Sequence, residues 1–181
     1  KLLNCGKNHL YDIQFAQDAS VRNFMGKNQK ANTIVLEDTD TYDLKELYGK
    51  DVEISNLKGA TLDGMILKDI KRGTDITYTI SYKNGIKLDV TLRFVLNNAW
   101  KTPLTISDWT YGDTPKEPQG EALYGDVTFT YSDSETGTFT TDVPTNAGTW
   151  YVKASVEDDR YVELSAVASF TIHKATPIIN S

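Results

Sequence analysis

The strongest constraint on the fold is a short motif that occurs twice near the start of the chain. The tripeptide Gly6-Lys7-Asn8 returns as Gly26-Lys27-Asn28, and the first copy lies in the spacing Leu3-x-Cys5-x-x-Asn8-x-Leu10. Self-similarity at a short period is typical of chains that stack one coil on the next, and a single coil cannot bury its apolar face alone. We therefore expect residues 1–33 to be one end of a stacked array joined to a different kind of domain.

In this motif, Leu3, Cys5 and Leu10 are expected to point inward from a short strand, while the Asn8 side chain hydrogen-bonds to the backbone at the turn. The pattern resembles the leucine-rich repeat, in particular its cysteine-containing bacterial form. The resemblance covers about one and a half repeats and aligns Asn28 with Asn8. An irregular β segment is the alternative interpretation of the same residues.

Composition favours strands and excludes some partners. The chain is rich in β-branched and aromatic residues, with 10 Tyr, 6 Phe and 3 Trp, which predicts a mostly β protein. The formal net charge is −6, and residues 102–181 carry most of it, with 4 Lys or Arg against 12 Asp or Glu. Because acidic surfaces repel phosphate, we expect neither a nucleic acid nor an anionic membrane as a partner.

The chain has one cysteine, Cys5, which excludes an internal disulfide. No stretch approaches the roughly 20 apolar residues that a spanning helix needs, so we expect no membrane insertion. The sequence begins with Lys1 and ends shortly after Lys174-Ala175-Thr176-Pro177, which we interpret as an excised piece of a longer protein.

Alternating apolar and polar residues predict a β-hairpin in the first half. Short strands are expected at 34–38 and 51–57, and alternation over 76–82 and 86–96 flanks the turn residues Asn84-Gly85. A two-residue loop would set the apolar face of one strand beside the polar face of the other. We therefore predict a three-residue loop with Gly85 left-handed, which pairs Tyr82 with Ile86, Ile80 with Leu88 and Tyr78 with Val90.

A second module is expected after Pro103 and the turn at Trp109-Thr110-Tyr111-Gly112-Asp113. Strands are predicted at about 126–132, 138–143, 148–157 and 162–173. In the third of these, Trp150, Val152, Ala154 and Val156 share one face. We expect an antiparallel sheet with one buried side.

Residues 104–177 resemble a tandem immunoglobulin-like repeat of Gram-positive surface proteins. The resemblance rests on Tyr111-Gly112-Asp113, on Ala147-Gly148-Thr149-Trp150-Tyr151 and on the terminal Lys174-Ala175-Thr176-Pro177. Together with the first motif, the order of modules is similar to that of internalin-type proteins, and this resemblance implies an extracellular or cell-surface location.

The expected fold is therefore a leucine-rich-repeat stub followed by two small immunoglobulin-like antiparallel β-sandwich modules. The expected boundaries are 1–33 for the end of the repeat array, 34–101 for the first immunoglobulin-like module, 102–175 for the second and 176–181 for a linker.

No catalytic or metal-binding spacing stands out. The two histidines, His9 and His173, fit surface or edge-strand positions, and Cys5 fits a buried thiol of the repeat core. The acidic clusters Asp38-Thr39-Asp40-x-x-Asp43 and Glu157-Asp158-Asp159 lack the glycine and the distal glutamate of a calcium loop and fit solvated turns. We assign no catalytic, metal or cofactor residue and expect no enzyme.

The expected function is adhesion or protein–protein interaction, with immunoglobulin-like modules that cap and space a leucine-rich recognition region. The expected partner is a protein receptor or another surface protein. A glycan is the second candidate, because Trp109 and Tyr111 near a turn could stack on a sugar. The alternative function is that of a carbohydrate-binding module of a secreted multidomain enzyme.

Overall fold

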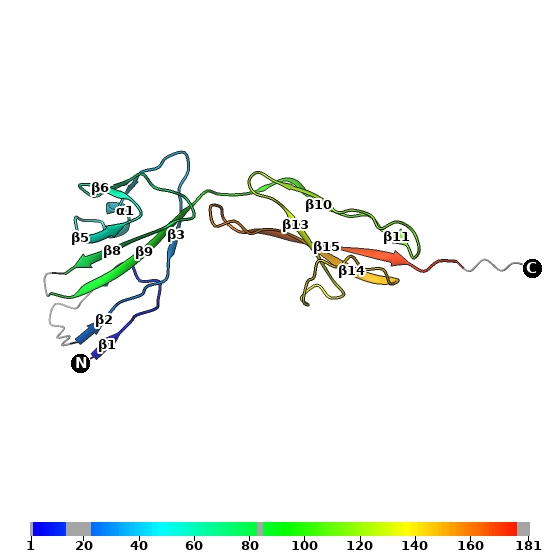
Figure 1. Ribbon diagram of the computed structural model, residues 1–181, viewed down its shortest axis with the longest axis horizontal. Coiled ribbons are helices and arrows are strands. Elements are labelled where there is room, and N and C mark those ends of the chain that lie inside the picture. The colour runs from blue at the N-terminus through cyan, green and yellow to red at the C-terminus, as the bar shows by residue number, and fades with distance from the viewer. Residues whose placement is uncertain (1, 14–22, 83–84, 177–181) are drawn as a thin grey trace, which may run out of the picture. The chain divides into compact units, whose positions relative to one another are not determined.

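The computed structural model describes residues 2–13, 23–82 and 85–176, which form two compact units (Figure 1). Unit 1 comprises Lys1–Asn97 with Asp159–Val162, and unit 2 comprises Asn98–Asp158 with Glu163–Ser181. Regular structure in the described residues is almost entirely strand, with one short helix, α1 (Lys45–Tyr48). The prediction of a mostly β chain is confirmed.

The chain begins with a small parallel sheet. Strand β1 (Leu2–Asn4) pairs with β2 (Asn23–Met25), so that Leu2 lies opposite Asn23 and Leu3 opposite Phe24. The pairing continues beyond the strands, where the backbone N–H of Cys5 donates to Met25 O and that of Lys7 to Lys27 O. These residues, 2–13 and 23–31, are called the coil below; each of the two segments is one turn of it.

The main sheet of unit 1 has four strands in the order β3-β9-β8-β5. Their bounds are Asn32–Val35 for β3, Lys87–Val95 for β9, Asp75–Ser81 for β8 and Glu53–Lys58 for β5. The strands expected at 34–38 and 51–57 are thus present with shifted bounds. Because β3 runs parallel to β9, this sheet is mixed rather than antiparallel, which corrects the expected sandwich of antiparallel strands.

The hairpin register is confirmed. Ile80 pairs with Leu88 and Tyr78 with Val90, and the N–H of Tyr82 donates to Ile86 O at 2.8 Å. Gly85 has a φ of 80°, as a left-handed loop residue requires. Lys83 and Asn84 themselves lie outside the described residues. The in-phase apolar faces of β8 and β9 therefore decide the register.

A second, three-stranded sheet completes unit 1, in the order β4-β7-β6. Its bounds are Tyr42–Asp43 for β4, Ile66–Lys68 for β7 and Thr61–Asp63 for β6. Both sheets and α1 contribute to one hydrophobic core, whose fully buried members include Leu44, Leu67, Ile76, Ile80, Leu88, Val90, Leu92 and Phe94.

The coil shares this core. Leu10, Ile13 and Phe24 pack against it, so residues of the coil and of the sheets bury apolar surface together. Within the core the hydroxyls of Tyr48 and Tyr78 lie 2.6 Å apart. Burial raises the pKa of both phenols well above the ordinary value.

Unit 2 contains a four-stranded sheet in the order β11-β15-β14-β13 and a two-stranded sheet of β10 and β12. The bounds are Trp109–Thr110 for β11, Leu164–His173 for β15, Gly148–Val156 for β14, Thr128–Ser132 for β13, Trp100–Thr105 for β10 and Gln119–Ala122 for β12. Side chains from both sheets pack together, with Leu104 of β10 and Phe129 of β13 against the cluster around Phe170.

Two expectations for unit 2 are corrected. Residues 138–143 form no strand, and only Thr140 makes an isolated bridge, to Tyr131. Val143 is exposed and precedes Pro144, which has no backbone N–H to donate to a further ladder bond. The sheet is also not purely antiparallel, because β11 joins β15 in parallel.

The predicted inward face of β14 is confirmed, with Val152, Ala154 and Val156 buried. These three residues alternate along the strand, as a sheet with one buried side requires. The expected linker lies outside the described residues after Thr176.

Candidate interaction face

The side chains that hold the coil together form a ladder of amides. The Asn8 amide nitrogen donates to Cys5 O at 3.1 Å, three residues back along the chain. The Gln29 amide nitrogen donates to Gly26 O at 3.2 Å, also three residues back. The structural counterpart of Asn8 is therefore Gln29, and the expectation that Asn28 repeats the contact of Asn8 is wrong. The pairing of Leu2 with Asn23 places Asn8 and Gln29 in the same register, one residue longer than the separation of the identical tripeptides.

Gln29 also links one turn of the coil to the other. Its amide nitrogen donates to Cys5 O at 2.7 Å, and its amide oxygen accepts from the N–H of Leu10 at 3.1 Å. The residue is buried, with 6% of its surface exposed. A buried backbone group without a partner costs free energy, and this single side chain satisfies backbone groups from both turns.

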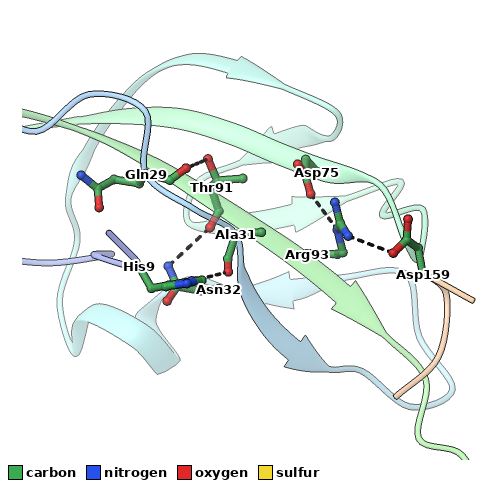
Figure 2. Close-up of polar contacts among 8 residues, drawn as sticks. All are labelled: His9, Gln29, Ala31, Asn32, Asp75, Thr91, Arg93 and Asp159. Atoms are coloured by element: carbon green, nitrogen blue, oxygen red, sulfur yellow. Dashed lines mark hydrogen bonds and ion pairs between the residues drawn. The ribbon is translucent and has the colours of Figure 1, made fainter. Parts of the chain in front are cut away.

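A row of polar contacts lies where the coil meets β9 of the main sheet (Figure 2). The Thr91 hydroxyl donates to Gln29 O at 3.1 Å, and the Asn32 amide donates to Thr91 O. His9 Nδ1 donates to Ala31 O at 2.7 Å. Of these three contacts, the one from Thr91 joins the coil to the main sheet, whereas the Asn32 contact lies within the sheet and the His9 contact within the coil.

Further along the same strand, Arg93 is held between two carboxylates. Its Nε donates to Asp75 Oδ1 at 2.7 Å and its Nη1 to Asp159 Oδ1 at 3.1 Å (Figure 2). The N–H of Leu96 donates to Arg160 O at 2.8 Å. Segment 159–162 is thus attached to the sheet of unit 1 by an ion pair and by backbone hydrogen bonds.

A groove of about 920 Å³ lies where the coil meets the tip of the β8–β9 hairpin. Residues of both turns and of the start of β9 line it: Asn4, Gly6, Lys7, Phe24, Met25, Gly26, Lys27, Asn28, Gly85, Ile86 and Lys87. Met25 is 52% exposed, although it follows Phe24, which packs on the core. Among the described lining residues three are lysines and none is a carboxylate. We call this the lysine groove.

Sequence reasoning missed both features of this face. Neither Gln29 nor the lysine groove was singled out. A signal was present for Gln29, because it follows Gly26 by the same spacing that separates Asn8 from Cys5. No local pattern could reveal the groove, because its residues come from three separate segments.

Cys5, His9 and His173, the residues considered for catalysis, occupy structural positions. Cys5 is partly buried, and burial raises the pKa of its thiol, which lowers the thiolate fraction. His9 lies in the coil, where its side chain donates a hydrogen bond to Ala31 O. His173 lies at the end of β15, where its Nε2 is 3.4 Å from Asp108 Oδ2 and both side chains are exposed. No hydrogen bond among the described residues joins the side chains of Cys5, His9 and His173.

The first acidic cluster runs from bends at Asp38 and Asp40 into β4, and Asp159 of the second cluster lies in a turn and pairs with Arg93. Asp43 Oδ1 accepts from the N–H of Lys45 at the start of α1, and the Arg72 guanidinium donates to Leu36 O and Thr39 O beside the first cluster. In the described part of the chain, no group of three or more His, Cys, Asp or Glu side chains is placed to hold a metal ion.

The aromatic residues weighed for sugar stacking differ in exposure. Trp109 is buried and stacks on Phe170 with ring centroids 4.8 Å apart, whereas Tyr111 is 54% exposed in the turn that contains Gly112, a residue of positive φ. Trp109 is therefore a core residue and cannot form a flat platform together with Tyr111.

Comparison with known proteins leaves the family unassigned. No family model and no curated protein matches this chain. Similar solved structures include extracellular domains 3–5 of Drosophila OTK, immunoglobulin domains 1–4 of Sidekick-1 and the I-band fragment I67–I69 of titin.

The OTK structure has a TM-score of 0.33 and 10% identity, and the match covers 81% of this chain and 59% of that one. The Sidekick-1 structure has a TM-score of 0.26 and 9% identity, and the match covers 82% of this chain and 50% of that one. The titin fragment has a TM-score of 0.28 and 11% identity, and the match covers 80% of this chain and 63% of that one. This chain therefore spans between half and two thirds of each of them, and at these TM-scores the likeness assigns no family. None of the described helices is long and apolar enough to cross a membrane.

Proposed function

We propose that this chain is a non-catalytic protein-interaction module of an extracellular or cell-surface protein, in which unit 1 closes one end of a leucine-rich-repeat array. Unit 1 beyond the coil and unit 2 act as immunoglobulin-like modules that cap the array and space it from the rest of the protein. The bacterial, internalin-like origin belongs to this proposal and rests on the sequence motifs.

The observation that carries the proposal is the amide ladder of the coil. Successive parallel strands, with Gln29 joining the two turns and Phe24 packed on the core of the adjoining sheet, are what the last coil of a solenoid needs. The sheet holds the coil through β9, while among the described strands β1 pairs with β2 alone. A terminal coil that is attached to the sheet on one face and has an unpaired strand edge can pair with a further coil at that edge.

Adding coils tests this proposal. Two further coils of the same length, with the Leu-x-Cys-x-x-Asn-x-Leu spacing, are fused before Leu2, and hydrogen exchange of the added backbone is measured. We expect the added coils to be protected and to unfold together with unit 1. A matched fusion that carries Gln29→Ala should lose this joint transition. Added coils that exchange as fast as an unfolded chain would contradict the capping role.

A further inference from the structure

We propose that the lysine groove binds an extended acidic peptide segment with an apolar side chain at its centre, supplied by a partner protein. The proposal rests on the proposed function as an interaction module and adds to it the chemistry of the partner. It follows from the apolar floor of the groove, its charge and its size.

The floor of the groove is apolar and supported from beneath. Phe24 packs on the core of unit 1, and Ile86 is 8% exposed just before the second hairpin strand. Met25 belongs to the same lining and is half exposed. Methionine adapts its shape to an incoming apolar side chain, so this floor fits a leucine-like or aromatic anchor.

The described residues that line the groove carry charge of one sign. Lys7, Lys27 and Lys87 line it, and in the described part of the chain no ion pair joins any of them to a carboxylate. Elsewhere Lys45 and Lys68 each pair with a neighbouring aspartate. Three uncompensated ammonium groups around an apolar floor complement carboxylates on both sides of an apolar anchor.

The size and the overall charge favour a peptide over a long polyanion. A volume of about 920 Å³ lies in the range of about 300–1,000 Å³ that holds a compact ligand. Residues 1–101 carry 15 Lys or Arg against 13 Asp or Glu, so this half of the chain has no broad positive field that would hold a polyphosphate or a sulfated chain beyond the groove. A short peptide confines its negative charge to the three lysines.

A fluorescence anisotropy titration with the full chain tests the proposal. The probe is the fluorescein-labelled peptide Gly-Glu-Asp-Leu-Glu-Leu-Asp-Glu-Gly, and a second probe carries glutamine and asparagine in place of its acids. We expect micromolar binding of the acidic probe only. The triple substitution Lys7→Gln, Lys27→Gln and Lys87→Gln should weaken binding about tenfold, as three exposed ion pairs imply. Met25→Ser should weaken it severalfold and reduce the binding that survives at high salt.

The matched control changes the same net charge elsewhere. Lys50→Gln, Lys71→Gln and Lys116→Gln alter exposed lysines outside the groove and should change the affinity less than twofold. Circular dichroism confirms that each variant is folded.

Four results would overturn the inference. The first two are absence of binding by the acidic probe and equal weakening of its binding by the control triple substitution. The other two are tighter binding of heparin than of the peptide, and light scattering that shows the chain associating with itself and thereby releasing the peptide. If the added coils stack on unit 1 and the acidic probe still fails to bind, the capping role stands and the partner chemistry alone is wrong.

Discussion

Gln29→Ala is expected to destabilise unit 1 far more than its position in a short, irregular segment implies. The side chain makes three hydrogen bonds, to Cys5 O, to Gly26 O and from the N–H of Leu10. At about 1 kcal/mol for each buried bond, the loss is about 3 kcal/mol. With a urea dependence of about 2 kcal/mol per M, the unfolding midpoint of unit 1 should fall by about 1.5 M.

The chain allows the two units to be followed separately. All three tryptophans, Trp100, Trp109 and Trp150, lie in unit 2, so tryptophan fluorescence reports the unfolding of unit 2. Hydrogen exchange resolved by peptide mass reports unit 1. Gln29→Ala should lower protection throughout the described coil and the main sheet of unit 1.

The matched control is Asn8→Ala, at the equivalent position of the other turn. Asn8 donates to Cys5 O and Gly6 O but is exposed, so water replaces its contacts and the expected cost is below about 1 kcal/mol. Equal costs for the two alanine variants would refute the reasoning, because the burial of Gln29 is what makes its bonds costly to lose.

Replacing the same amide with an acid gives a pH signature. In Gln29→Glu the nitrogen donor to Cys5 O and Gly26 O becomes an oxygen, and burial beside two carbonyls raises the pKa of the introduced carboxyl in the folded state. The unfolded chain then releases its proton first, so stability falls as the pH rises above about 4.3 and stops falling above the folded-state pKa. A penalty that stays constant in urea titrations between about pH 4 and about pH 8 would contradict this role of the donor.

Three further expectations concern unit 1. Gly73→Ala should lower the free energy of unfolding by about 2–3 kcal/mol, because the residue has a φ of 75° and a Cβ would lie 3.0 Å from backbone atoms of segment 159–162. The control Gly64→Ala, at a φ of 61° with nothing within 4 Å of the added Cβ, should lower it by about 1 kcal/mol in the same urea titration. Tyr48→Phe and Tyr78→Phe should each cost about 1–2 kcal/mol, and the double variant less than their sum, because each single change leaves a buried hydroxyl without its partner. Since burial raises the pKa of both phenols, the unfolded chain loses their protons first and stability should fall above about pH 10, less steeply in the double variant.

The sequence predicted the elements whose register depends on neighbouring residues. The β8–β9 hairpin follows from two apolar faces and one glycine, because a shift by one residue would expose Ile80 or Leu88, both almost fully buried. The inward face of β14 follows from the same alternation. Within one hairpin or one strand, the alternation of apolar and polar residues is enough to predict which side chains are buried and how the strands pair.

The parallel strand pairs outside the coil were missed, since they join segments that no local pattern connects. Strand β3 lies on β9 with Asn32 opposite Leu92, and β11 lies on β15 with Trp109 opposite Ile172. The lysine groove was missed for the same reason. Its position depends on the coil and the hairpin tip being folded against one core.

The misalignment of the repeat shows which residues set the register of a stacked coil. Lys7 and Asn28 both adopt left-handed backbone conformations, with φ of 60° and 57°, and they correspond in the register that pairs Leu2 with Asn23. Asparagine is among the residues that tolerate this conformation best, so the turn accounts for Asn28, which does not take the ladder position of Asn8. The ladder position in that turn belongs to Gln29, whose longer side chain reaches Cys5 O of the neighbouring turn as well as Gly26 O of its own. The buried amide and the left-handed residue thus give one and the same register. Neither Gly6 nor Gly26 has a positive φ, so the identity of the two tripeptides one residue away does not follow from this backbone conformation.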